Sequence, residues 1–454
     1  MTTCTPRAAW GNLLRRLHFY VGLFVGPFIF FAALTGTLYV ATPQLESALY
    51  RHALYTNTVG EPLALAQQIA AAEKIVGPAL QLHAVRPGLA YGETTRVMFA
   101  DAELGPSEHR AIFIDPLTLE VRGDMTVYGT SGILPLRQKI DYLHNSLMMG
   151  DFGRLYSELA ASWMWVSALG GIALWFSTRP KRRIVNRFQN RRRLHVILGW
   201  TLLGGMLLFS ATGLTWSKWA GGNVDKLRAE MNWLTPQVNT TLSGTPVITH
   251  EHAEHRSHHG AMERPEITRD LSLFDGVFHA ARDAGIDANK LEIRPARRAN
   301  QAWTVAEIDR GWPTQVDTVA VDPHALQIVD RIRFDDFPLM AKLTRWGVDF
   351  HMGILFGVVN QLLLIAFGVA LSVLIVWGYR MWWIRRPAQS AANPVQTLFQ
   401  SWLALSRWGR GITLLVSVML GLALPVMGTS LVVFIIVDWL RWRSTFPPSL
   451  FPSA

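Results

Sequence analysis

Residues 17–40 read LHFYVGLFVGPFIFFAALTGTLYV, which is a leucine and a histidine followed by an almost unbroken apolar run. A helix of this length crosses the roughly 30 Å hydrocarbon layer of a bilayer. The stretch has a counterpart later in the chain, because Thr212-Gly213 follows His195 at the same interval as Thr35-Gly36 follows His18. The matching intervals predict a duplicated membrane unit with one histidine in each half.

The chain has 454 residues, of which 50% are hydrophobic, and a formal net charge of +10. Basic residues are concentrated at 1–16, 179–193 and 380–410, which contain no acidic residue. In the C-terminal apolar region Asp438 is the one acidic residue. Basic segments beside apolar spans mark the cytoplasmic side of a membrane. We therefore interpret these segments as topology determinants at lipid headgroups, and we expect no nucleic-acid partner.

Cys4 is the single cysteine. It excludes internal disulfides, iron–sulfur clusters held by thiolates and a Cys-x-x-Cys-His haem attachment. The arginines before the first apolar run also fit a signal peptide. However, the run is longer than a typical signal core, and its counterpart at His195 cannot be a signal. An uncleaved first span is therefore favoured.

Hydropathy and the positive-inside rule predict a helical membrane protein with both termini in the cytoplasm and two soluble domains on the other side. In chain order the expected segments are a cytoplasmic N-terminus (1–17), a first span (18–40), a soluble domain (41–135), an interfacial segment with the second span (136–177), a basic cytoplasmic loop (178–194), a third span (195–217), a second soluble domain (218–340), an interfacial segment with the fourth span (341–379), a cytoplasmic linker (380–402), a fifth span (403–424), a sixth span (426–440) and a cytoplasmic tail (441–454).

The last apolar region is interrupted by Pro425 and Gly428. As one helix it would exceed the bilayer thickness, whereas the two arms of a hairpin are long enough when tilted. Arg441 and Arg443 at its far end favour the hairpin with the C-terminus inside. A single span is the alternative.

The two soluble domains share one order of elements, a helix followed by four strands, which predicts an α+β fold for each. Asp115-Pro116 predicts the turn between the last two strands of the first domain, and Asp322-Pro323 predicts the same turn in the second. The expected elements are a helix between Glu61-Pro62 and Gly77-Pro78 with strands at 81–85, 96–100, 111–114 and 119–121, then a helix at 271–284 with strands at 290–294, 302–307, 316–321 and 327–331.

Four histidines lie at predicted membrane boundaries, His18 and His195 at the cytoplasmic edge and His144 and His351 at the outer edge. The members of each pair occupy equivalent positions in the two halves, so a pseudo-twofold axis along the membrane normal would bring them face to face. That arrangement is typical of two haems b, each held by two imidazoles that keep the iron six-coordinate. The alternative is that these are amphipathic residues at the headgroup level, although ionisable residues at spans are functional candidates by default.

A ligating histidine needs a hydrogen-bond partner for its other ring nitrogen, and Asp141 or Asp349 could supply one to the outer pair. Glycines such as Gly36 and Gly213 fit either the close approach of a flat macrocycle or ordinary helix packing. Basic residues near the outer pair could hold haem propionates or contact lipid headgroups. These residues are Arg137, Lys139, Arg154 and Arg345.

The second soluble domain carries a His-rich insertion at 245–265. This composition is typical of a surface loop that attracts metal weakly. A true zinc or iron site is less favoured, because no cysteine and few carboxylates accompany the histidines. The candidate residues are His250, His252, His255, His258 and His259.

Leu17-His18 and its repeat at Leu194-His195, the Asp-Pro hairpins, and Leu143-His144 and Phe350-His351 before two of the spans together resemble the PepSY-associated transmembrane family. The resemblance covers residues 12–385. It implies a bacterial inner-membrane protein with two periplasmic PepSY-type domains. Several members are associated with iron uptake and are similar to ferric-siderophore reductases that pass electrons through membrane haems.

Two functions follow as expectations. The first is a di-haem electron-transfer protein, in which electrons pass from His18/His195 to His144/His351 and then to ferric siderophore iron or another periplasmic oxidant. No catalytic residue separate from the haem ligands is expected. The donor would be membrane quinol or a cytoplasmic reductase, since the sequence has no nicotinamide fingerprint. The second is a haem-free membrane protein whose PepSY domains bind a periplasmic partner or peptide in a regulatory role.

Overall fold

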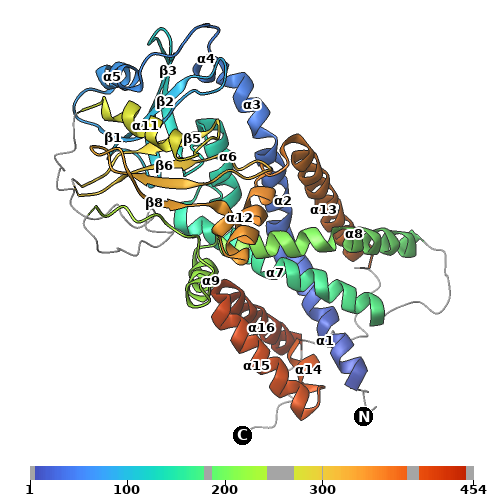
Figure 1. Ribbon diagram of the computed structural model, residues 1–454. Coiled ribbons are helices and arrows are strands. Elements are labelled where there is room, and N and C mark those ends of the chain that lie inside the picture. The colour runs from blue at the N-terminus through green and yellow to red at the C-terminus, as the bar shows by residue number, and fades with distance from the viewer. Residues whose placement is uncertain (1–5, 178–186, 243–269, 299, 386–397, 446–454) are drawn as a thin grey trace. The chain divides into compact units, whose positions relative to one another are not determined.

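The computed structural model describes residues 6–177, 187–242, 270–298, 300–385 and 398–445, which are drawn as ribbons in Figure 1. The chain forms two compact units. The helical unit comprises 1–39, 141–231 and 362–454, and the sheet unit comprises 40–140 and 232–361, in each case as far as these residues are described.

The helical unit is built from long apolar helices. Its first helix is continuous through α1 (Pro6–Tyr20), a π-helical turn (Val21–Val25) and α2 (Gly26–Val40). The others are α7 (Gly150–Ser177), α8 (Arg187–Thr215), α9 (Trp219–Glu230), α13 (Gly357–Arg385), α14 (Leu398–Leu403), α15 (Arg407–Ala423) and α16 (Pro425–Thr445).

Within the described residues, four helices are long and apolar enough to cross a membrane. They are Ala9–Val40, Gly150–Ser177, Arg191–Thr215 and Gly357–Ile384. These are the first four spans that hydropathy predicts. Large apolar side chains are at least half exposed both on these helices, as at Leu363, and on the C-terminal helices, as at Leu415 and Val433. Such an exposed apolar surface is what a lipid-embedded helix presents.

Two of these helices begin earlier than the spans predicted at 18–40 and 195–217. Ala9–Val40 begins well before His18, and Arg191–Thr215 begins before His195, so neither histidine is at the end of its helix. The charge of the arginines in the added turns need not end these helices, because a long arginine side chain can lie along apolar surface while its charged end reaches water.

The C-terminal apolar region forms two helices, as its interruption predicts. Helix α15 ends at Ala423, and α16 begins at Pro425, where a proline has no intrahelical hydrogen bond to lose. The helices pack together near Gly421 and Gly428, since a Cβ on Gly428 would lie 2.6 Å from the Cα of Gly421. The apolar stretch Pro425–Leu440 is shorter than the four long spans.

Asp438, the acid in the apolar region, is buried in the helical unit at 1% exposure and accepts a hydrogen bond from the Tyr20 hydroxyl. A second polar contact joins the Trp163 indole to the Ser430 hydroxyl at 2.8 Å. The two contacts attach α16 to α1 and α7.

The sheet unit contains one antiparallel sheet of eight strands in the order β4-β3-β2-β1-β5-β6-β7-β8. The strands are β1 (Gln81–Arg86), β2 (Thr95–Ala100), β3 (Glu108–Ile114), β4 (Val121–Tyr128), β5 (Leu291–Arg294), β6 (Trp303–Glu307), β7 (Thr318–Val321) and β8 (Ile328–Ile332). The helices are α3 (Thr42–Leu49), α4 (Arg51–Leu54), α5 (Leu65–Val76), α6 (Pro135–Ser146, whose last residues belong to the helical unit), α11 (Leu273–Asp283) and α12 (Leu339–His351), with a 3₁₀ turn at Phe334–Asp336.

The strands predicted for two separate domains lie in this single sheet. Strands β1 and β5 pair at Val85 and Ile293. Helices α5 and α11 lie against the sheet (Figure 1), and one apolar core under both helices runs across the pairing. The Asp275 carboxylate of α11 also accepts hydrogen bonds from the first amides of α5, at 2.7 and 3.0 Å. An unpaired edge strand exposes its backbone polar groups. Pairing β1 with β5 covers one edge of each four-stranded set and leaves β4 and β8 as the edges of the sheet.

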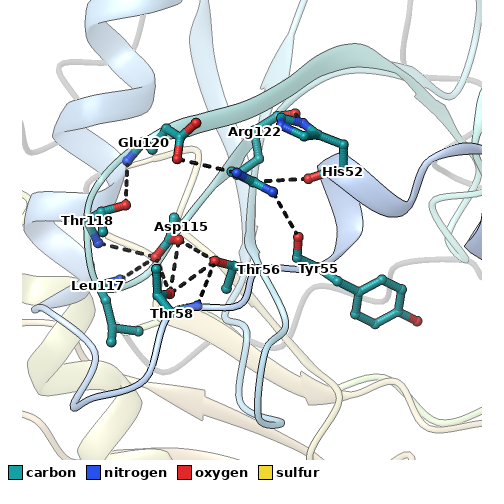
Figure 2. Close-up of polar contacts among 9 residues, drawn as sticks. All are labelled: His52, Tyr55, Thr56, Thr58, Asp115, Leu117, Thr118, Glu120 and Arg122. Atoms are coloured by element: carbon teal, nitrogen blue, oxygen red, sulfur yellow. Dashed lines mark hydrogen bonds and ion pairs between the residues drawn. The ribbon is translucent and has the colours of Figure 1, made fainter.

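The order of a helix and four strands occurs twice, as predicted. Most ends differ by a few residues, but the strand expected at 119–121 runs over Val121–Tyr128 instead. Residue 119 was expected in a strand, but Leu119 has φ of 63° and ends the turn before β4. Figure 2 shows how Asp115 builds this turn, accepting hydrogen bonds from the amides of Leu117 and Thr118 and from the hydroxyls of Thr56 and Thr58. Burial raises the pKa of Asp115, but these hydrogen bonds outweigh it, so the pKa lies below its usual value. Asp322 binds the amides of the equivalent turn in the same way.

Glu292 links β5 to β1 through a buried charge network. Its carboxylate forms ion pairs with Arg86 Nε at 2.6 Å and with Arg294 Nε at 2.5 Å, and its side chain is 4% exposed. Burial raises the pKa of Glu292, but the two arginines outweigh it and lower the pKa to about 2.

Replacing Glu292 with glutamine is expected to destabilise the sheet unit by about 3–5 kcal/mol, because it leaves buried guanidinium charge unpaired. Because the folded-state pKa is depressed, the stabilisation by Glu292 is present above its unfolded-state pKa and is lost as pH falls toward 2. Thermal unfolding of the detergent-solubilised protein, measured from pH 7 to pH 3, should show an acid-dependent loss that is smaller in Glu292→Gln.

The exposed Glu120–Arg122 pair, at 3.3 Å, provides the matched control. Glu120→Gln should cost no more than about 1 kcal/mol. Equal melting temperatures for Glu292→Gln and Glu120→Gln would contradict the role assigned to Glu292.

Candidate histidine site

His18 and His195 lie next to each other in the helical unit. His18 is on α1 and His195 is on α8, and the centres of their rings are 6.5 Å apart, with an angle of 81° between the ring planes. The structure thus brings together two of the four histidines that the sequence singles out.

The Nδ1 atoms of both rings face backbone carbonyl oxygens. His18 Nδ1 is 3.0 Å from the oxygen of Ser167, and His195 Nδ1 is 3.3 Å from the oxygen of Leu374. A carbonyl oxygen can only accept, so Nδ1 must carry the proton and donate it in each bond. In the neutral ring this places the lone pair on Nε2.

A glycine lies against each of these rings. A Cβ on Gly171 would lie 3.2 Å from Cε1 of His18, and a Cβ on Gly378 would lie 3.7 Å from Cε1 of His195. The two imidazole rings therefore have room because positions 171 and 378 carry no side chain, and the space is tighter at Gly171.

These contacts repeat between the two halves of the chain. Ser167 and Gly171 stand in α7 at the same intervals from Gly150 as Leu374 and Gly378 stand in α13 from Gly357. Each histidine thus rests on the second span of its own half through the same two positions. None of these four residues was predicted from the sequence, although their equal intervals are visible there.

A π-helical turn follows His18 within the first span. Pro27 has no amide hydrogen, so the carbonyl of Leu23 cannot receive the usual helical bond from it. The Tyr379 hydroxyl donates to this carbonyl instead, at 2.7 Å. The distortion is therefore satisfied by α13, the helix that also carries Leu374. Such π-turns often occur at functional sites.

His144 lies in α6 and belongs to the helical unit. Its Nδ1 is 3.0 Å from the Thr35 hydroxyl. Burial lowers the pKa of His144 to about 4, and a hydrogen bond to the carbonyl of Ala32 opposes this only partly, so the ring is neutral at pH 7. The sequence offered Asp141 as the partner of this histidine, but the structure gives Thr35 that position, and Asp141 accepts from the Asn145 side chain at 3.0 Å.

His351 is the last residue of α12 and belongs to the sheet unit. Asp349, its other predicted partner, is fully buried and accepts from Arg310 Nε at 2.6 Å. Burial raises the pKa of Asp349 above its usual value, and the charges of Arg310 and Arg345 oppose this shift. Arg310 also donates to the Ser131 hydroxyl, so it joins α12 to the loop before α6. No pattern in the sequence pointed to Arg310. Since the outer histidines belong to different units, their pairing stays a prediction.

The basic residues proposed for propionates have varied surroundings. Arg154 donates to the backbone oxygen of Trp216 at 2.8 Å. Arg137 is buried in the sheet unit at 8% exposure. The positive charge of Arg345 favours the ionised form of the Asp349 carboxyl group. The role of these residues in holding a cofactor stays a prediction.

The histidines of the insertion, His250 to His259, lie outside the described residues. Among the residues that are described, no group of three or more His, Cys, Asp or Glu side chains is placed to hold a metal ion.

Four apolar helices long enough to cross a bilayer, together with an antiparallel sheet, define a membrane protein. The chain belongs to the family of the PepSY-associated TM region, whose family model matches residues 15–385. The match ends before α14, so α14–α16 lie outside it. No curated protein matches the chain.

Proposed function

We propose that this protein is a di-haem electron-transfer protein of the bacterial inner membrane that reduces ferric siderophore iron in the periplasm during iron uptake. The observation that carries the proposal is the neighbouring pair of His18 and His195, each with its Nδ1 bonded to a backbone carbonyl. Buried ionisable side chains in spans are costly and generally functional.

The residues of this pair fit a haem iron. An imidazole nitrogen binds a metal at about 2 Å, and its ring centre lies roughly 1 Å further away, so two ligands of one metal ion have ring centres about 6 Å apart. The 6.5 Å separation of His18 and His195 is of this size. Their carbonyl partners also leave the lone pair on Nε2, as a neutral ligand requires. A bound haem would accept and release one electron at a time.

The chain's own residues would set the properties of this inner site. The carbonyls of Ser167 and Leu374 hold the two rings in one tautomer and increase the basicity of Nε2. A more basic ligand favours the oxidised metal ion. Gly171 and Gly378 leave room for the rings to stay in this orientation.

Sequence equivalence extends the proposal to an outer haem. His144 and His351 precede Gly150 and Gly357 at the same interval, and we propose them as the two ligands. From the basic segments we infer that the inner pair faces the cytoplasm, that both termini are cytoplasmic and that the sheet unit is periplasmic. The chain would then be two copies of a span–PepSY–span unit followed by a hairpin.

Ferric siderophore is the proposed acceptor on the basis of the family resemblance. Siderophore oxygens are hard ligands that bind Fe(III) far more tightly than Fe(II), so one-electron reduction releases the metal. Membrane quinol or a cytoplasmic reductase would supply the electrons.

The substrate is tested by anaerobic reoxidation. Purified protein is reduced with dithionite, freed of excess reductant and mixed with ferric siderophore, with haem oxidation followed by absorbance and Fe(II) by a ferrous chelator. We expect oxidation with stoichiometric Fe(II), but none with the same siderophore loaded with redox-inert gallium(III). Reduced haem that is stable to ferric siderophores but oxidised by quinone would remove this substrate. A colourless, folded protein would favour the haem-free partner-binding function.

A further inference from the structure

We propose that Thr35-Gly36 is a cradle that positions His144, with Thr35 fixing the tautomer of its imidazole and Gly36 fixing the place of its ring. The inference rests on the proposed function, in which His144 is a haem ligand. It makes Thr35 a positioning residue that acts through the histidine.

The direction of the hydrogen bonds at Thr35 determines the tautomer. The Thr35 hydroxyl is 2.8 Å from the carbonyl oxygen of Phe31 and 3.2 Å from that of Ala32. Its single hydrogen points to these acceptors, as is usual for a threonine within a helix. The hydroxyl oxygen must then accept at its contact with His144 Nδ1, at 3.0 Å. Nδ1 therefore carries the hydrogen, and the lone pair stands on Nε2. The carbonyl of Ala32, which also accepts from His144, favours the same tautomer.

Gly36 limits where the ring can lie. A Cβ on Gly36 would stand 3.2 Å from Cε1 of His144, 3.6 Å from Nδ1 and 3.9 Å from Nε2. The edge of the imidazole thus lies against the α2 backbone, and larger side chains at this position would displace it. The contact matches those of Gly171 with His18 and Gly378 with His195.

The backbone at His144 is held by α7. The Tyr156 hydroxyl donates to the carbonyl oxygen of His144, and the Ser157 hydroxyl donates to that of Asn145 at 2.7 Å. These bonds fix the backbone at the end of α6, so the imidazole can leave Thr35 only by rotation about its own side-chain bonds. Thr35 is itself 2% exposed, so water does not compete for the bond.

The first test measures the haem. Thr35→Val removes the acceptor while keeping the shape of the side chain, and Thr35→Ser restores the hydroxyl. We expect Thr35→Val to bind one of its two haems about 10–100-fold more weakly and to raise the midpoint potential of that haem, as loss of such a partner does. Thr35→Ser should return both values to those of the wild type. Thr37→Val is the matched control, because Thr37 on the same helix also donates to a carbonyl at 2.8 Å.

The second test does not depend on haem. In haem-free protein labelled with ¹⁵N-histidine, the His144 resonances, assigned with His144→Ala, should report the Nδ1–H tautomer in the wild type. Thr35→Val should shift them toward a mixture of tautomers. If the wild type binds no haem but Thr35→Val still shifts the His144 resonances, the proposed function is refuted and the cradle is supported. Unchanged NMR shifts and haem properties in Thr35→Val, or equal changes in Thr37→Val, would overturn the cradle.

Discussion

Replacing His195 with alanine is expected to remove one of the two haems, so that the protein retains about half of its bound haem. The reason is that the proposed inner site would lose one of its two histidine ligands, which His18 alone could not replace. His18→Ala should have the same effect, because the two residues form one site at a ring separation of 6.5 Å. The measurement is haem per protein chain, together with the low-spin absorbance bands of the reduced protein.

Two variants test the specificity of this result. His324 lies exposed in the β7–β8 turn of the sheet unit, so His324→Ala should retain the full haem content. The double variant His18→Ala/His195→Ala should lose no more haem than either single variant. A stepwise additional loss in the double variant would mean that the two histidines belong to different sites.

A leucine at Gly171 is expected to disrupt the inner site as strongly as loss of its ligand. The Cβ alone would lie 3.2 Å from Cε1 of His18, and the further carbons of leucine have no room without displacing the imidazole. Glycine is a poor helix former, so leucine stabilises an isolated helix by about 1 kcal/mol at such a position. The helix should therefore persist while one haem is lost, which visible spectroscopy and circular dichroism can measure together.

Gly204 provides the matched control for this substitution. It lies in α8, and a Cβ there has no neighbour within 4 Å. Gly204→Leu should leave the haem content and spectrum unchanged. Equal haem loss in both variants would mean that bulk in the spans, rather than contact with His18, causes the effect.

The sequence predicted the elements better than the contacts between them. Long apolar runs, and turn residues such as Asp115-Pro116, leave a local signal, so the first four spans and the two sets of a helix and four strands were readable. The pairing of Val85 with Ile293, which joins both sets in one sheet, leaves no such signal because it depends on two distant edge strands.

The histidine site shows the same limit. Repeat intervals pointed to His18 and His195, and the structure places them together. Their partners at Ser167 and Leu374 act through backbone oxygens, which any residue type supplies, so side-chain identity gives no indication of them. Asp438 was visible as an isolated acid, but its hydrogen bond with Tyr20 spans almost the whole chain and depends on tertiary packing.

The central claim is that two pairs of histidines hold two haems, and the haem content of the purified protein tests it most directly. The protein would be expressed with sufficient haem supply, purified in detergent, and analysed by the pyridine haemochrome method with protein quantified by amino-acid analysis. We predict about two haems b per chain, with low-spin spectra in both redox states. A folded, colourless protein that also fails to bind added haem would contradict the account.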